Sequence, residues 1–277
     1  MRDFLKQFGL LSLVVFLSDI AWANEQKRIQ LGDDDAMRIG KRIWKNECSG
    51  TVEGLTMWNK GEEFPSLGIG HFIWYPVGYE GPFAESFPKV VAFMLEQGDP
   101  VPQWLRTAVK QGAPWPDRET FYKVYNNEQM RQLRHFLVET IKTQARFAAR
   151  RMEEALDKIL ATLESSQAAH VKKQFYRVAT HPHGVYVLMD YVNFKGEGTN
   201  INERYAGKGW GLLQVLEEMQ GSEAGELALD EFADKSIFVL QRRVHHSDPK
   251  RGEQRWMAGW TNRCNTYRIS GWDKLLE

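Results

Sequence analysis

The fold is decided by residues 43–72, which read IWKNECSGTVEGLTMWNKGEEFPSLGIGHF. The first part ends a helical pattern at Glu47, and the rest is rich in glycine, with aromatic residues between the glycines. Such a run predicts a short β-hairpin or a three-stranded sheet over 49–76. Gly68 and Gly70 lie in its last strand, and glycine in a strand indicates that backbone or a ligand approaches closely.

A helix precedes the glycine-rich segment. Apolar residues recur at helical spacing through Met37, Ile39 and Ile43. The acidic trio at 33–35 can satisfy the free N–H groups at a helix start and oppose its dipole. The pattern therefore predicts a helix over 35–47.

The remainder of the chain is dominated by helical periodicity, from about 77 to 250. It contains no internal repeat, no low-complexity tract and no long Pro/Ser-rich linker. We predict one domain over 24–277 of the α+β class, mostly α, in which the small β part forms one wall of a cleft.

The amino-terminal segment predicts export. Arg2 and Lys6 precede the apolar core Phe8–Leu17, and Ala21–Ala23 supplies small residues at cleavage offsets. We predict a signal peptide over 1–23 and a secreted or periplasmic protein. The apolar core is too short for a bilayer crossing, and no later segment is long and apolar enough for one.

The charge balance argues against nucleic-acid binding. The chain carries 36 basic and 36 acidic residues, so it has no overall basic excess for a phosphate backbone. The histidine pairs 181/183 and 245/246 lack the helical i, i+4 spacing of a zinc site. We predict no metal site and no cofactor; the oligomeric state stays open.

The two cysteines, Cys48 and Cys264, predict one disulfide in an oxidising compartment. Two buried free thiols are the alternative. A bridge would place the carboxy-terminal residues beside Glu47.

Glu47 is the leading candidate for catalysis. Trp44 lies three residues earlier, on the same helix face. A carboxyl held against apolar walls has a raised pKa and can donate a proton near neutral pH. Glycoside hydrolysis also uses a second carboxylate across the cleft, for which Glu62 and Glu63 are the nearest candidates.

These residues resemble the active-site layout of phage-type lysozymes, in which a helix-end glutamate precedes a hairpin ending in T-x-G-x-G-H. The corresponding residues here are Ser66-Leu67-Gly68-Ile69-Gly70-His71. The family's carboxy-terminal G-L-x-x-R helix is matched by Gly259, Trp260 and Arg263. The resemblance implies a lysozyme-like fold that cleaves peptidoglycan glycan strands, with Glu47 as general acid and the Ser66 hydroxyl orienting water or substrate.

The chain departs from this pattern at the hairpin acid. The family places an aspartate eight residues before the first glycine of G-x-G, where this sequence has Lys60. A second alignment places the catalytic glutamate at Glu53, which would not lie at a helix end. The departure keeps three alternatives open: a lytic transglycosylase, which needs one glutamate only; chitosanase-like activity; and a non-catalytic envelope protein that binds glycan or a partner.

A polysaccharide, most simply peptidoglycan, is the predicted partner. Its sugar faces could stack on aromatic residues, and its polar groups could bind a loop between two helices. The predicted substrate-binding residues are Trp58, Gly68, Gly70, Trp74, Tyr75, Glu197 and Trp210.

Overall fold

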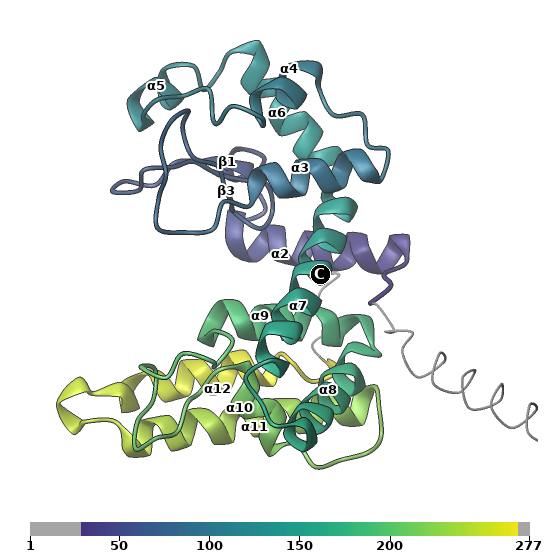
Figure 1. Ribbon diagram of the computed structural model, residues 1–277, viewed down its shortest axis with the longest axis vertical. Helices are drawn as coiled ribbons and strands as arrows, with labels where there is room; N and C mark the ends of the chain where they lie inside the picture. Colours follow the sequence, from purple (N-terminus) through teal and green to yellow (C-terminus); the bar gives the residue numbers. More distant parts are fainter. Residues whose placement is uncertain (1–28, 271–277) are drawn as a thin grey trace, which may run out of the picture.

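The computed structural model describes residues 29–270. The predicted signal peptide lies outside the described residues. The described chain forms two lobes joined by one long helix, α7, which runs between them (Figure 1). Buried apolar side chains form one continuous core cluster through both lobes.

The upper lobe holds the sheet and the shorter helices. Its sheet is antiparallel, with strand order β1-β2-β3, and each strand is only two residues long. The elements are α2 (Asp33–Cys48), η1 (Glu53–Leu55), β1 (Thr56–Met57), β2 (Ser66–Leu67), β3 (Phe72–Ile73), α3 (Phe87–Glu96), α4 (Gln103–Ala108), α5 (Arg118–Lys123) and α6 (Glu128–Glu139).

Helix α2 follows the predicted pattern closely. Its first turn contains the three aspartates, and its apolar face buries Ala36, Ile39 and Ile43. Asp33 also fixes α2 to α7, because its carboxylate accepts hydrogen bonds from Lys142 at 2.6 Å and Arg146 at 2.5 Å. These two cations lower the pKa of Asp33 to about 2.

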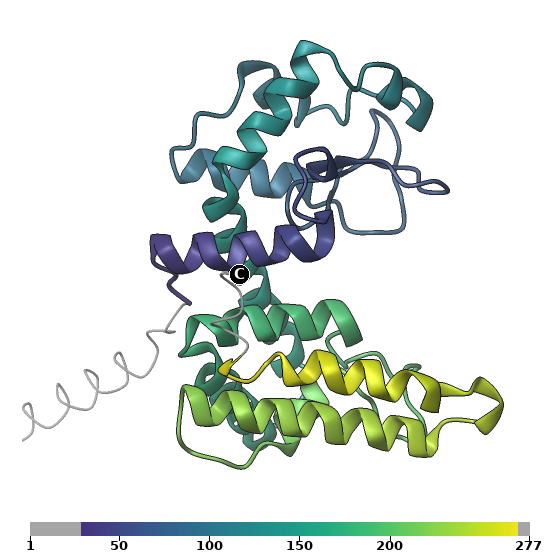
Figure 2. The same ribbon diagram turned by 180° about the vertical axis from the view of Figure 1, so that it is seen from behind.

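The lower lobe is helical throughout its described part. Helix α9 lies between α2 and the lower pair of helices, α11 and α12, which form a long antiparallel pair (Figure 2). The elements from the connecting helix onward are α7 (Ile141–Leu160), α8 (Ser165–Ala179), α9 (Pro182–Lys195), α10 (Leu212–Glu218), α11 (Glu226–His246), η2 (Pro249–Arg251), η3 (Glu253–Trp256) and α12 (Met257–Asn265).

The predicted α+β class, mostly α with one small sheet near the start, is confirmed. The helix predicted over 35–47 is present and runs from Asp33 to Cys48. Within residues 29–270, no helix is long and apolar enough to cross a membrane.

The predicted disulfide is wrong in this structure, where Cys48 and Cys264 are both free and buried. Cys48 ends α2 in the upper lobe, and its thiol lies 3.6 Å from the Gly68 carbonyl oxygen as a donor. Cys264 lies in α12 of the lower lobe. Each thiol therefore belongs to the core of its own lobe. Burial raises the pKa of both thiols to about 12.

Candidate functional site

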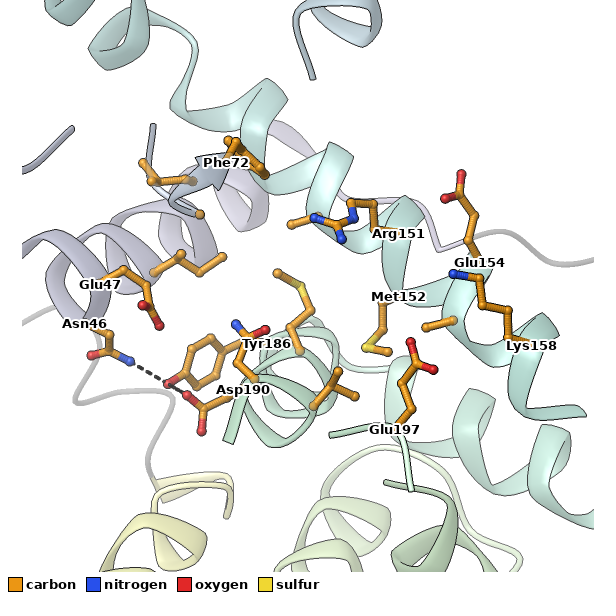
Figure 3. A pocket seen from close by; sticks show the side chains of 18 residues that line it. Asn46, Glu47, Phe72, Arg151, Met152, Glu154, Lys158, Tyr186, Asp190 and Glu197 are labelled. Carbon is orange, nitrogen blue, oxygen red and sulfur yellow. Dashed lines mark hydrogen bonds between the residues drawn. The ribbon is translucent and has the colours of Figure 1, made fainter. Parts of the chain in front are cut away.

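A cavity of about 180 Å³ lies between the two lobes. Its walls come from the end of α2, the loop before β3, one face of α7, the face of α9 that points to the upper lobe, and the loop after α9 (Figure 3). The lining residues are Ile43, Asn46, Glu47, Ile69, Gly70, Phe72, Ala148, Arg151, Met152, Glu154, Ala155, Lys158, Tyr186, Met189, Asp190, Val192, Asn193 and Glu197.

Glu47 contributes the upper-lobe carboxylate of this cavity. It stands one residue before the end of α2, and its side chain keeps 37% of its surface exposed. Its Oε2 atom lies 4.0 Å from Nδ1 of His71. Trp44 turns away to donate a hydrogen bond to the Thr51 carbonyl at 2.8 Å, so it closes the turn after α2 and does not line the cavity. The predicted apolar enclosure of Glu47 is therefore only partial.

The lower lobe supplies two carboxylates, of which Glu197 is unpartnered. Gly196 and Glu197 are fixed through their carbonyl oxygens, which accept hydrogen bonds from Leu212 and Leu213 at the start of α10, both at 3.0 Å. Among residues 29–270, the Glu197 carboxylate has no ion pair or hydrogen bond. Figure 3 shows Glu47 and Glu197 pointing into the cavity from the two lobes.

Asp190 is the second lower-lobe carboxylate and is fully engaged. Arg263 of α12 donates to it through Nε at 2.8 Å and through Nη2 at 2.7 Å. Tyr267 donates to it at 2.7 Å and Tyr186 at 3.3 Å. Its side chain is only 6% exposed. The Asp190 carboxylate raises the pKa of Arg263, and Asp190 acts as a structural group that joins α9 to α12.

Tyr186 completes the floor of the cavity. Burial, followed by the charge of Asp190, raises the pKa of its phenol to about 12. The phenol therefore stays protonated and donates to Asp190. Its oxygen accepts a hydrogen bond from Asn46 of α2 at 2.9 Å, the dashed line in Figure 3.

The hairpin acids predicted to assist Glu47 lie outside this cavity. The Glu62 carboxylate accepts a hydrogen bond from Asn59 at 3.2 Å, within the exposed turn between β1 and β2. Glu63 is exposed in the same turn. The side chain of Ser66 is buried in β2, where its residue pairs with Ile73, so the structure does not bring its hydroxyl to Glu47.

The alternative glutamate, Glu53, also lies outside the cavity. It stands in η1, and its carbonyl oxygen accepts a hydrogen bond from Tyr125 at 2.9 Å. Of the glutamates weighed in the amino-terminal segment, Glu47 alone lines the interlobe cavity.

The two glycines of G-x-G have different surroundings. Gly68 has φ +72°, and a Cβ atom there would lie 2.4 Å from Oε1 of Gln144 on α7. The same oxygen accepts a hydrogen bond from Ile69 N at 2.9 Å. What approaches Gly68 is therefore the connecting helix, and Gly68 does not line the cavity. Gly70 does line the cavity, where a Cβ atom would lie 2.9 Å from the Phe72 ring.

The aromatic residues predicted to stack on sugars are buried. Trp74 has no exposed surface and packs against Phe87 and Trp115. Trp58 is 2% exposed, and Tyr75 is 5% exposed. These three are buried in the upper lobe, and none of them lines the interlobe cavity.

Trp210 lies in the lower lobe and does not line the interlobe cavity. Its ring centroid is 4.7 Å from that of Tyr205, and the Arg243 guanidinium lies 4.1 Å from its ring centre. It is 8% exposed, so it too is a packing residue.

The cavity also contains polar residues that were not predicted from the sequence: Asn46, Arg151, Glu154, Lys158, Tyr186, Asp190 and Asn193. One signal was present. Asp190 is a lone acid within the apolar helix HGVYVLMDYV, and an acid in such a helix must find a buried partner. Its partner is Arg263, which the GWxxR pattern did select.

No cluster of three or more His, Cys, Asp or Glu side chains that could hold a metal ion is found between residues 29 and 270. Comparisons with protein-family models, with curated proteins and with solved structures gave no match.

Proposed function

We propose that this chain is a secreted or periplasmic glycosidase that cleaves the glycan strands of peptidoglycan, with Glu47 as general acid. The observation that carries the proposal is the position of Glu47. It ends α2 at the mouth of an interlobe cavity, opposite the unpartnered carboxylate of Glu197. The β-containing lobe, the long connecting helix and the helical lobe together support a lysozyme-like fold.

In the proposed reaction, Glu47 protonates the oxygen of the scissile glycosidic bond. The partly exposed position of this carboxyl leaves it accessible to a polymer entering between the lobes. Asp190 does not take part, because its oxygens already accept hydrogen bonds from Arg263, Tyr186 and Tyr267. Its role is to hold α9, and with it Tyr186, against α12.

Glu197 replaces Glu62 and Glu63 as the second carboxylate of the proposal. A second carboxylate across the cleft can act as base for a water or as nucleophile. Glu197 lines the cavity and has no competing partner among the described residues, whereas both hairpin acids lie elsewhere. Its loop is fixed to the start of α10, which limits how far the carboxylate can move.

A lytic transglycosylase is the second candidate. The specific observation in its favour is that the hairpin contributes no carboxylate to the cavity. Such an enzyme needs only the glutamate that donates and then recovers a proton. In that case Glu197 would bind the substrate and would not take part in the reaction.

The test is cleavage of purified peptidoglycan, chitosan and chitin by the mature protein, followed by turbidity and by mass analysis of the products. We expect Glu47→Gln to lower the rate at least ~100-fold, the range of a general acid. Glu63→Gln, the same change in the exposed turn, should leave the rate unchanged. If Glu47→Gln cleaves all three polymers as the unaltered protein does, or if neither cleaves any, the enzyme proposal fails.

The activity of Glu197→Gln and the chemical form of the product ends together distinguish the two mechanisms. A hydrolase yields reducing ends and loses activity in this variant. A transglycosylase yields anhydro ends and retains its chemistry, with weaker substrate binding only.

A further inference from the structure

A second, larger depression, of about 510 Å³, lies at the far end of the lower lobe. It is formed where α11 ends, by η2 and η3, and by the start of α12. In Figures 1 and 2 this connection projects past the rest of the lobe, on the side where the β1–β2 hairpin projects from the upper lobe. The lining residues are Arg243, Arg251, Glu253, Arg255, Trp256 and Trp260, none of which lines the interlobe cavity.

A buried carboxylate organises this depression. Glu253 is 6% exposed and accepts hydrogen bonds from Arg243 at 2.7 Å and from Arg251 at 3.2 Å. Tyr205 donates to it at 2.8 Å. One carboxylate thus positions two guanidinium groups. Arg255 also lines the depression, so three arginines and one glutamate lie in its wall and it carries excess positive charge.

The arginines retain donors for a ligand. Arg251 uses Nε toward Glu253, and its side chain is 58% exposed. Arg255 makes no hydrogen bond or ion pair within the described chain, and its guanidinium lies 5.0 Å from the Trp256 ring centre. Guanidinium groups with unused N–H donors bind carboxylates and phosphates in a bidentate manner.

The aromatic residues add flat apolar surface beside these cations. Trp256 is 52% exposed, whereas tryptophan is highly buried on average. Trp260 is partly buried, with Lys195 Nζ 3.6 Å from its ring centre. Burial, and then the charge of Arg243, lower the pKa of Lys195 to about 8.

We propose that this depression binds a glycan chain bearing carboxylate or phosphate groups, with Arg251 and Arg255 holding the anionic group and Trp256 contacting a sugar face. Charge complementarity argues for an anionic ligand, and the exposed ring beside the arginines argues for a ring-containing one. The site would hold the polymer independently of cleavage at Glu47, so this inference does not rest on the proposed function.

The test is equilibrium binding, with Glu47→Gln as background so that no polymer is consumed. The probes are polygalacturonate, which bears carboxylates, phosphorylated dextran, which bears phosphates, and neutral dextran. We expect binding to one or both anionic polymers, weakened at least ~10-fold by Arg251→Gln/Arg255→Gln, since each lost charge-assisted contact is substantial. Which anionic polymer binds tells carboxylate from phosphate recognition.

Matched controls make the result interpretable. Lys123→Gln/Arg131→Gln removes the same charge from exposed positions on α5 and α6 and should change binding less than ~2-fold, because screened distant charges contribute little. Arg255→Gln alone breaks no contact to a polar group of the described chain, so its loss of binding cannot be ascribed to misfolding. Trp256→Ala should weaken the binding of the anionic polymers more than it weakens the binding of inorganic phosphate.

Three outcomes would overturn the proposal. The first is that neither anionic polymer binds more tightly than neutral dextran. The second is that both double variants weaken binding equally, which would indicate net charge alone. The third is binding to phosphatidylglycerol vesicles, but not to the polymers, with dependence on Trp256, which would make the depression a membrane-contact surface.

Discussion

Asn46 on α2 donates a hydrogen bond to the phenol oxygen of Tyr186 on α9, 2.9 Å away, and so joins the two lobes beside Glu47. The two partners are unequal. Asn46 is exposed and can turn to water, whereas Tyr186 is 3% exposed. Tyr186, in the lower lobe, is therefore the fixed partner of this hydrogen bond, and Asn46 is the partner that can move.

We predict that Tyr186→Phe lowers the free energy of unfolding by about 1–3 kcal/mol, because two hydrogen bonds are lost and each has a net value of about 0.5–1.5 kcal/mol. The ring and its packing remain, and both the Asn46 contact and the bond to Asp190 are lost. Urea unfolding measures the loss. Asn46→Ala is the control and should cost less, because only the exposed partner is removed. Equal losses would show that the interlobe bond, and not the Asp190 contact, dominates.

The Asp190–Arg263 pair should be costly to break, because the Asp190 carboxylate is buried. Removing one member of a buried pair costs about 3–5 kcal/mol, and a smaller cost applies here because 39% of the Arg263 side chain is exposed. We predict about 2–3 kcal/mol for Asp190→Asn, measured by urea unfolding. The double change Asp190→Asn/Arg263→Gln should cost less than the two single changes together, because the uncompensated charge is gone. Additive losses would contradict a direct coupling.

Local sequence patterns predicted the features of the fold that depend on residues close together in the chain. The α2 helix follows from its acidic first turn and its apolar spacing, and Glu47 is placed at its end by the same pattern. The second carboxylate could not be placed in this way. Whether Glu62 or Glu197 shares a cavity with Glu47 depends on how α9 packs against α2 and α7, which are contacts between distant segments.

Contacts between distant segments also determine the surroundings of the aromatic residues and of Gly68 in the hairpin. Trp74 and Gly68 stand in a motif that suggests a ligand surface, yet their neighbours are Trp115 and Gln144, far along the chain. A two-residue strand exposes little surface of its own. Trp58, Ser66 and Trp74 of the hairpin segment are therefore buried in the upper lobe. Ile69, Gly70 and Phe72 are the residues of this segment that line the cavity.

Gly68 gives a direct test of this interpretation. We predict that Gly68→Ala destabilises the protein through a positive φ of +72° and a Cβ atom 2.4 Å from Gln144 Oε1. Gly78→Ala is the matched control, with φ +76° and no atom within 4 Å of its Cβ position. Gly78→Ala should lower the free energy of unfolding by about 1–2 kcal/mol through backbone strain alone. Gly68→Ala should lower it by about 1–3 kcal/mol more. Equal costs in thermal and urea unfolding would mean that α7 yields easily at this point.

Glu253 should make the stability of the lower lobe dependent on pH. Hydrogen bonds led by that from Arg243 lower the pKa of this carboxyl from 4.5 to about 2. A carboxyl whose pKa is lower in the folded state stabilises the fold above its ordinary pKa, and this contribution is lost as the pH falls through the folded-state pKa. The contribution of Glu253 is therefore complete above about pH 4.5 and declines between there and about pH 2.

The measurement is urea unfolding of the unaltered protein and of Glu253→Gln, at about pH 6 and at about pH 3. We expect the variant to be less stable near pH 6 and the difference to narrow near pH 3. Glu63→Gln changes an exposed carboxylate outside any such network and should show no difference that varies with pH. A difference for Glu253→Gln that stays constant between the two pH values would mean that Glu253 contributes through packing and hydrogen bonding that do not require its charge.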